Sequence, residues 1–421
     1  MKSYEWAVVG GGIAGIAVSE ILAREGHSVV LVDQNEKLAS ATTRDFHEWI
    51  HTGALYTLVP DRLLTLKFIL GAVDDLIEYY SAFDRMNLMP TMAGLSIDSR
   101  SDGWFSPNYI RFKYRVKGRK IVFPWLVGVA RSLYINEKLH GHDWLRRRAG
   151  ELGPLKDNIW REAIARSIKL LGYRDKFLEF QTTDFTTNSR LLLRDIVGTA
   201  VGNGLTVSLG NKVEEVTEDG QSLVVHGQKD SFRVSRVAVC AGAGTSDFTE
   251  SEVTTSYAPI AVVRGISPEM TSFVELDYFR KNCINILTKK NGVGLIGGIT
   301  VSHREECDPY LDFVIAEHKK LNPDLQVIER YVGYKNEVTF KTQERNYLYH
   351  INSVEGRKNM WSIIPGKFTL AFSLAPEFYR RVYSKNPRKS FVTHQSDEPT
   401  ANMVANTAWY DAWNAHKNHE K

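Results

Sequence analysis

One stretch near the amino terminus limits what the rest of this chain can fold into. An apolar run, Trp6-Ala7-Val8-Val9, leads directly into Gly10-Gly11-Gly12-Ile13-Ala14-Gly15. A helical pattern then runs to Glu25, and a second apolar run over 28–32 ends on Asp33. Short apolar strands on either side of a helix are typical of a parallel sheet that is buried on both faces. The stretch therefore predicts a β-α-β unit.

The glycines and the terminal acid of this unit each have a use in binding a dinucleotide. Gly10 permits the tight turn, Gly12 leaves no Cβ between the backbone and a pyrophosphate, and Gly15 lets helix and strand pack closely. The helix N-terminus offers N–H groups to the pyrophosphate. Asp33 can accept hydrogen bonds from the ribose hydroxyls. A β-α-β unit without a ligand would leave Gly15 and Asp33 unexplained, so we predict a dinucleotide site.

Length and composition narrow the class of protein. A chain of 421 residues is longer than a single hydrophobic core usually accommodates, so two domains are expected. A net charge of +4 suits anionic small molecules and argues against nucleic-acid binding. The three cysteines, Cys240, Cys283 and Cys307, form no CxxC pair, so neither a disulfide framework nor a cysteine metal site is expected.

The sequence also bears on location. No apolar run is long enough to span a bilayer, and the chain enters its first strand within a few residues, which leaves no room for a cleavable signal. We therefore expect a cytoplasmic protein with no integral membrane segment, and peripheral membrane contact stays open. Its expected partner is a small-molecule substrate, and the sequence does not determine the oligomeric state.

Residues 47–51 spell HExxH, the signature of zinc-protease helices. Such a site needs a stable helix that presents both histidines on one face, and a third ligand downstream. Gly53 would break that helix within two residues of His51, and the motif lies inside the nucleotide-binding unit. We therefore predict no metal at His47 and His51, and a chance match.

The later chain leaves the α/β pattern and returns to it. A long helix is predicted over 60–89, strands over 94–123 and helices over 125–180. A helix over 190–201, capped by Thr186-Thr187-Asn188-Ser189, and strands near 205–209, 213–217 and 236–240 restore the first pattern. A second excursion is rich in strands, with one helix over 310–320. The strand over 360–364 then enters Pro365-Gly366-Lys367-Phe368-Thr369 and a helix to Val382, a second N-terminus suited to an anion.

This order predicts an α/β protein with two discontinuous domains. The nucleotide-binding domain is expected over 1–60, 185–250 and 355–385. An α+β substrate domain built on an antiparallel sheet is expected over 61–184 and 251–354. Residues 386–421 read as a polar tail, in which Trp409 and Trp413 are candidate docking anchors.

Four stretches together resemble the D-amino-acid-oxidase family of FAD-dependent oxidoreductases: 10–33, 38–56, 189–242 and 365–369. Within that family, Leu38-Ala39, Thr43 and Ile50-His51-Thr52-Gly53 with Tyr56 look most like the L-2-hydroxyglutarate dehydrogenase/oxidase branch. The glycerol-3-phosphate dehydrogenases are the next most similar. The resemblance implies bound FAD in a Rossmann-type domain, with the second domain over the flavin.

The resemblance also assigns residues to the cofactor. The segment from Thr43 is expected along the flavin, the segment at Val213 at the adenine, and the last turn at the flavin O2 side. The implied FAD-binding residues are Gly10, Gly12, Ile13, Ala14, Gly15, Asp33, Gln34, Thr42, Thr43, Arg44, Val213, Ala241, Gly242, Gly366, Lys367, Phe368 and Thr369.

The expected reaction removes a hydride from a CH–OH or CH–NH carbon of a small anionic substrate such as a 2-hydroxy acid, while a base takes the proton. His51 is the candidate base, with an orienting hydrogen bond beside the flavin as the alternative role. His47 is a weaker candidate base and a candidate for a covalent flavin link. Arg264 and Lys335 are candidate clamps for the substrate's negative charge.

Other functions stay open at this point. They are an amino-acid, imino-acid or amine oxidase of the same family, an FAD- and NADPH-dependent monooxygenase, an NAD-dependent dehydrogenase, and a flavoprotein that only binds. Flavin absorption would exclude the NAD-dependent reading. Reduction of the flavin by NADPH without an organic substrate would indicate the monooxygenase.

Overall fold

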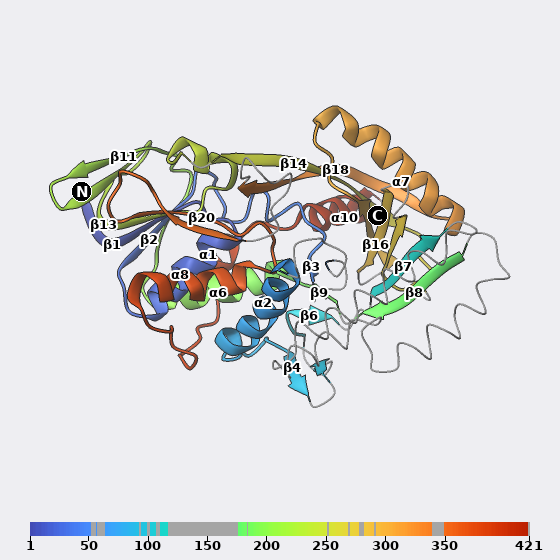
Figure 1. The fold of residues 1–421 in the computed structure, drawn as a ribbon, viewed down its shortest axis with the longest axis horizontal. Helices are drawn as coiled ribbons and strands as arrows, with labels where there is room; N and C mark the ends of the chain where they lie inside the picture. Colours follow the sequence, from blue (N-terminus) through green and yellow to red (C-terminus); the bar gives the residue numbers. More distant parts are fainter. Residues whose placement is uncertain are drawn as a thin grey trace.

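Two large sheets form the body of the molecule (Figure 1). The computed structural model describes residues 1–51, 56, 64–91, 94–98, 102–106, 110–116, 176–182, 184–250, 252–267, 270–277, 282–289, 292–338 and 349–419. An eight-stranded sheet lies at one end of the long axis and a seven-stranded sheet at the other, with strands β14 (Val253–Arg264) and β18 (Gln326–Val338) reaching between them.

The eight-stranded sheet contains the predicted β-α-β unit. Its order is β10-β2-β1-β13-β12-β11, with β20 paired to β13 and β19 paired to β20. The neighbours β10, β2, β1, β13 and β20 run parallel. The strands are β1 (Lys2–Val9), β2 (Val29–Val32), β10 (Thr206–Ser208), β11 (Val213–Asp219), β12 (Ser222–Gly227), β13 (Phe232–Val239), β19 (His350–Ser353) and β20 (Met360–Ile364). A short helix, η3 (Gly242–Asp247), follows β13.

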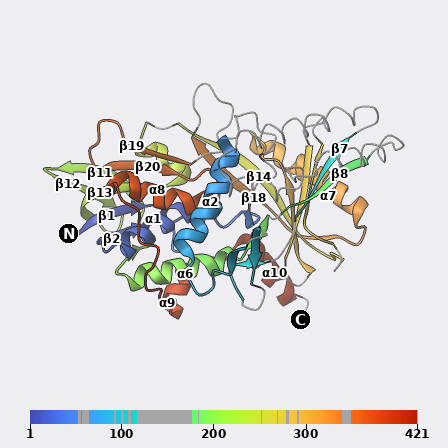
Figure 2. The same cartoon turned by 60° about the horizontal axis from the view of Figure 1, so that its bottom comes forward.

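Helices cover one face of this sheet (Figure 2). They are α1 (Ile13–Arg24), α6 (Ser189–Gly202) and α8 (Ala371–Tyr383). Every residue of α1 is buried, because the helix lies between the sheet and the other two helices. Such a position explains why the first helix is rich in alanine and isoleucine all round. The α6 N-cap is Asn188, one of the four residues predicted to cap this helix, and its side chain accepts the Leu191 N–H.

The seven-stranded sheet has the order β18-β14-β17-β16-β15-β7-β8 and is antiparallel apart from the β15–β7 pair. Helix α7 (Cys307–Leu321) packs on one face through Leu311 and Val314. The remaining strands of this sheet are β7 (Ile110–Val116), β8 (Lys176–Thr182), β15 (Phe273–Asp277), β16 (Asn282–Thr288) and β17 (Gly294–Gly298). The predicted antiparallel α+β unit is therefore present, with its helix on the side away from the first sheet (Figure 1).

Two predictions in the first excursion are corrected. The helix expected over 60–89 is α2 (Leu64–Tyr80), and residues 176–180, expected to be helical, lie in strand β8. Side chains of α2 and of the strands after it join the core beneath α1 and α8, so this segment packs with the nucleotide-binding half. The minor strands are β3 (Trp49–Ile50), β4 (Leu88–Thr91), β5 (Gly94–Ile97), β6 (Phe105–Ser106) and β9 (Phe185–Thr187). The helices predicted over 125–175 lie outside the described residues.

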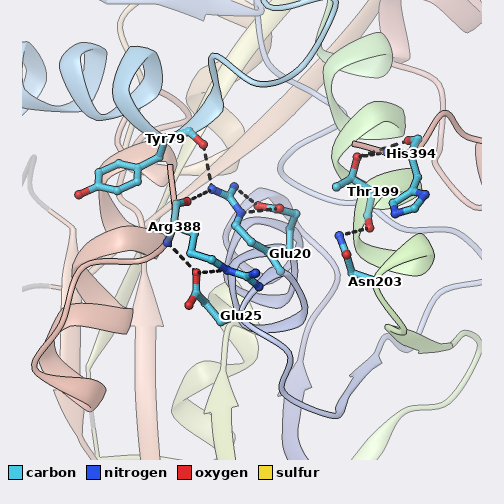
Figure 3. A network of polar contacts seen from close by, with 8 residues as sticks. Glu20, Glu25, Tyr79, Thr199, Asn203, Arg388 and His394 are labelled. Carbon is cyan, nitrogen blue, oxygen red and sulfur yellow. Dashed lines mark hydrogen bonds and ion pairs between the residues drawn. The ribbon is translucent and has the colours of Figure 1, made fainter. Parts of the chain in front are cut away.

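The segment after 385 is packed against the protein, which corrects its reading as a tail. Arg24, 2% exposed, donates to both oxygens of Glu20 and to the carbonyls of Tyr79 and Arg388. The Phe391 ring lies 3.7 Å from the Arg24 guanidinium carbon. Figure 3 shows Glu20, Tyr79 and Arg388 meeting at this point. A buried arginine whose three guanidinium nitrogens all donate hydrogen bonds ties α1, α2 and the C-terminal segment together.

Further along, the same segment packs on both halves of the protein. Val404 forms a β-bridge with Leu38, and short helices α9 (Glu398–Asn402) and α10 (Ala408–His419) flank it. Helix α10 packs through Trp409 and Trp413 on strands β14 and β17 of the seven-stranded sheet. The two tryptophans therefore anchor the segment, as the sequence predicted.

Candidate active site

The two glycine-containing turns open into one cavity of about 810 Å³ that lies between the two sheets. Most predicted site residues line it: Gly10, Gly12, Ile13, Ala14, Asp33, Gln34, Thr42, Thr43, His51, Val213, Ala241, Gly242, Lys335, Gly366, Lys367 and Phe368. Residues that lie more than 350 positions apart in the sequence therefore line one cavity large enough for a ligand. The sequence alone predicted this meeting only through the family resemblance.

The first turn has the geometry that its glycines predict. Gly10 has φ +102°, a region that favours glycine. A Cβ on Gly15 would lie 1.8 Å from the Gly10 carbonyl oxygen, so this position must lack a side chain for α1 to meet β1. A Cβ on Gly12 would meet nothing nearer than Thr43 Oγ1 at 3.4 Å. Space is therefore left at Gly12 on the cavity side, where a pyrophosphate is expected.

This contrast gives a matched pair of substitutions. Gly15→Ala is expected to destabilise the fold by about 1–3 kcal/mol or more, because the new methyl group overlaps backbone. Gly12→Ala is expected to fold with near-unchanged stability and to bind FAD at least about tenfold more weakly, a loss of about 1.4 kcal/mol. Chemical denaturation of the apoprotein and FAD titration measure the two effects. Equal FAD affinity in Gly12→Ala and the unaltered protein would contradict the assignment.

Asp33 is held in place before any ligand binds. Its side chain is 9% exposed, Oδ2 accepts the Gly11 N–H at 2.6 Å, and Oδ1 accepts the Asn35 N–H at 2.7 Å. These bonds fix the carboxylate at the end of β2, facing the cavity. A fixed acceptor at this point suits the hydroxyls of an adenosine ribose.

The segment after β2 completes the first helix. Thr43 Oγ1 accepts the Ile13 N–H at 3.0 Å and supplies a cap that Gly12, the N-cap residue, cannot. Thr42 Oγ1 accepts a hydrogen bond from Asn336 of β18 at 3.2 Å. The two threonines therefore join the glycine turn to the seven-stranded sheet, and the Ile13 amide is engaged within the protein.

The second turn begins its helix later than predicted. Helix α8 starts at Ala371, whereas the sequence suggested a start at 366–369, and Gly366 has φ +65°. Lys367 and Phe368 line the cavity from the turn itself. Thr369 is fully buried beneath it, and its Oγ1 accepts the His51 N–H at 3.1 Å. Thr369 therefore positions the backbone of His51 and does not line the cavity.

His51 is surrounded by aromatic rings and cations. Its ring lies 4.1 Å from that of Trp49 and 5.4 Å from that of Tyr56. Nδ1 is buried without a hydrogen-bond partner, and Asp184 Oδ2 lies 3.9 Å away, beyond bonding distance. Burial, and then the charges of Lys367 and Lys335, hold the pKa of His51 well below 6.5. His51 is therefore a neutral imidazole at physiological pH, with a nitrogen available to a ligand.

The HExxH segment is not a zinc-protease helix. Trp49 and Ile50 form strand β3, which pairs with β9, so the two histidines do not share a helical face. Burial, helped by Lys289, lowers the pKa of His47 to about 3. Across the described residues, no three His, Cys, Asp or Glu side chains gather in a way that could hold a metal ion.

Glu48, the central residue of that segment, is a buried anchor. It has φ +61°, and its side chain is 4% exposed. Oε1 accepts from the Ser189 N–H and hydroxyl, while Oε2 accepts from Lys289 Nζ at 2.6 Å and Trp409 Nε1 at 2.8 Å. Lys289 also donates to the His47 carbonyl. One carboxylate thus connects the histidine segment to α6, the end of β16 and α10.

Four predicted site residues do not line the cavity. Gly15 lies beneath the turn, Thr369 beneath His51, and Arg44 pairs with Asp411 of α10 at 2.9 Å. Arg264, at the far end of β14, donates to Gln326 at 2.8 Å. Arg264 is therefore no longer a candidate clamp for a substrate in this cavity, because the strand carries it away from the site.

Sequence reasoning missed several lining residues, among them Asp45 and Asn285. Burial raises the pKa of the Asp45 carboxyl to about 6. Asn285 is the polar residue within an apolar strand run, Cys283-Ile284-Asn285-Ile286-Leu287. That interruption was a usable signal, because a buried strand rarely carries an amide without a reason.

Comparison with known proteins shows which family this chain belongs to. The family model for FAD-dependent oxidoreductases named DAO matches residues 5–333. The chain belongs to this family. It is therefore an FAD-dependent oxidoreductase, as the resemblance implied, and no curated protein matches it.

Solved structures share the fold at low sequence identity. Glycine oxidase from Geobacillus kaustophilus is 13% identical with a TM-score of 0.65, covering 93% of this chain and 97% of its own. L-alpha-glycerophosphate oxidase from Mycoplasma pneumoniae, solved with FAD bound, is 16% identical with a TM-score of 0.63 and coverages of 97% and 100%. NikD, an unusual amino acid oxidase, is 13% identical with a TM-score of 0.64 and coverages of 97% and 98%.

The residues present fit FAD. The open space at Gly12 and the fixed carboxylate of Asp33 suit the dinucleotide end, while His51 and the 366–368 turn line the other part of the same cavity.

Among the described residues, no helix is both long and apolar enough to cross a membrane.

Proposed function

We propose that this enzyme oxidises a CH–OH or CH–NH carbon of a small anionic molecule, such as a 2-hydroxy acid or an amino acid. The observation that carries the proposal is the neutral His51 imidazole, which lines the FAD-family cavity together with Lys335 and Lys367. Bound FAD supplies the two-electron acceptor of the reaction.

The chain's own residues divide the remaining work. The neutral His51 imidazole lines the cavity and is our candidate for taking the hydroxyl or amine proton as the hydride leaves carbon. Among the lining residues that the structure describes, the basic side chains other than histidine are Lys212, Lys335 and Lys367. Lys335 and Lys367 lower the His51 pKa, so they lie close enough to act on charge at the reacting end. Lys335 Nζ is already paired with the buried carboxylate of Glu337, so Lys367 is our candidate for neutralising the substrate anion.

Anaerobic bleaching of the bound flavin tests the proposal. Purified enzyme would be mixed without oxygen with 2-hydroxy acids, amino acids and polyol phosphates, and with NADPH as a separate arm. We expect at least one anionic substrate to remove the flavin absorption, and NADPH alone to leave it. Bleaching by NADPH alone would indicate a monooxygenase, and a flavin that no substrate reduces would indicate a protein that only binds FAD.

The charges around His51 predict a pH dependence. A group with a lowered pKa stays neutral down to more acidic solution, so the acid limb of kcat/KM for flavin reduction is expected well below pH 6.5. Lys367→Met removes a positive charge that disfavours the imidazolium, so it raises the His51 pKa and moves this limb to higher pH. Lys212→Met, at a lysine that does not contribute to the His51 shift, is the matched control. A shift of the limb toward lower pH in Lys367→Met would contradict the arrangement.

A further inference from the structure

The cavity wall formed by β16 carries one polar side chain whose use the reaction does not explain. Successive residues of a strand face opposite sides of the sheet. Ile284 and Ile286 pack into the core beneath α7, whereas Cys283 and Asn285 line the cavity. Asn285 is only 4% exposed. A buried amide therefore faces the space over the flavin-binding half.

The Asn285 amide oxygen has no hydrogen-bond partner among the residues that the structure describes. Oδ1 is buried without a hydrogen bond, while the backbone carbonyl of the same residue accepts from His318 Nε2 at 3.1 Å. The neighbours in register are Val274 of β15 and Gly297 of β17, and neither has a polar side chain. Leaving such a group unpaired destabilises the protein, and a bound ligand that donates a hydrogen bond to it can recover that free energy.

A second unpartnered group lies beside it. A Cβ on Gly297 would lie 2.7 Å from His47 Nε2, so the His47 ring covers the position opposite Asn285 on the next strand. His47 Nε2 is also buried without a partner. With its pKa lowered to about 3, His47 is a neutral imidazole that can pair with a hydroxyl. The absence of a side chain at Gly297 is what admits this ring.

We propose that Asn285 and His47 form a subsite for a hydroxyl group of the substrate, separate from the carbon that is oxidised. This inference rests on the proposed function, in which His51 serves the reacting group and Lys367 serves the anion. The hydroxyl hydrogen is donated to Asn285 Oδ1, and the hydroxyl oxygen accepts a hydrogen bond from His47 Nε2–H, in the tautomer that carries its proton on Nε2. The preferred substrate is therefore a hydroxylated acid, and its deoxy analogue would leave the buried amide unpaired.

Ligand pairs that differ by one hydroxyl test this subsite through binding. The dissociation constants of glycerate against lactate, and of serine against alanine, can be measured anaerobically from perturbation of the oxidised flavin spectrum in the FAD-loaded enzyme. We expect the hydroxylated member of at least one pair to bind about tenfold tighter or more. Asn285→Leu, of similar volume, should remove that preference and leave the deoxy member's affinity unchanged or improved. Cys283→Ala, on the same wall, is the control that should keep the preference.

The outcomes separate the two proposals. Equal affinities within both pairs, no saturable binding of either hydroxylated member, or a preference that survives in Asn285→Leu would overturn the subsite. A preference that Asn285→Leu abolishes, in an enzyme whose flavin is not reduced by any tested ligand, would support the subsite and count against the proposed reaction. The comparison of ligands in the unaltered protein does not depend on whether the variant folds.

Discussion

His51→Asn is expected to slow anaerobic flavin reduction by about 10²–10⁴-fold, the usual contribution of a positioned general base. Asparagine retains the polar character and approximate size of the side chain but cannot take a proton at neutral pH. The His51 N–H donates to Thr369 from the backbone, so that contact is retained. Stopped-flow absorbance with the substrate found by the bleaching panel measures the rate, and FAD content should stay the same.

The control for this substitution is His226→Asn. His226 lies on β12 of the nucleotide-binding half, bonded to Thr217 at 2.8 Å, and does not line the cavity. Its replacement should leave flavin reduction within a factor of about two, consistent with the small effects of substitutions away from such sites. A loss of less than about threefold in His51→Asn would instead assign His51 the orienting role beside the flavin, because a missing base cannot be that mild.

Glu48→Ala is expected to lower the free energy of unfolding by about 3–5 kcal/mol, the cost of leaving one member of a buried ion pair without its partner. Lys289 is 7% exposed and would lose its carboxylate, and the donors of Ser189 and Trp409 would lose their acceptor. The His47 and His51 segment would also lose its tie to α6 and α10. Urea denaturation of the apoprotein measures the stability.

Two further variants make the Glu48 prediction specific. Glu48→Gln combined with Lys289→Met removes both charges, so it should recover part of the loss seen in Glu48→Ala. Glu36→Ala breaks the exposed pair with Lys229, whose side chains are 82% and 56% exposed, and should cost less than about 1 kcal/mol. If Glu48→Ala were as mild as Glu36→Ala, the carboxylate would not be the anchor that the contacts indicate.

The nucleotide-binding unit was predictable because its constraints are local. Gly10, Gly15 and Asp33 lie within one strand-turn-helix-strand, and each has its geometric reason within about 25 residues or at the adjoining strand. Helices α6 and α7 were predictable for the same reason, because burial on one face leaves a period in the sequence, whereas the short strand β19 was not predicted. Errors arose at element ends, as at α2 and α8, where neighbouring packing decides the boundary.

The sequence by itself therefore determined a β-α-β unit with an N-terminus suited to a pyrophosphate, and through family resemblance it determined FAD. Only the tertiary structure decided which later residues reach that cofactor site. It brought Lys335 and Asn285 to the cavity, carried Arg264 away from it, and placed Trp409 of the C-terminal segment on Glu48. The physical reason is that these contacts depend on how two sheets and a distant helix pack, and residues hundreds of positions apart leave no spacing pattern that records their meeting.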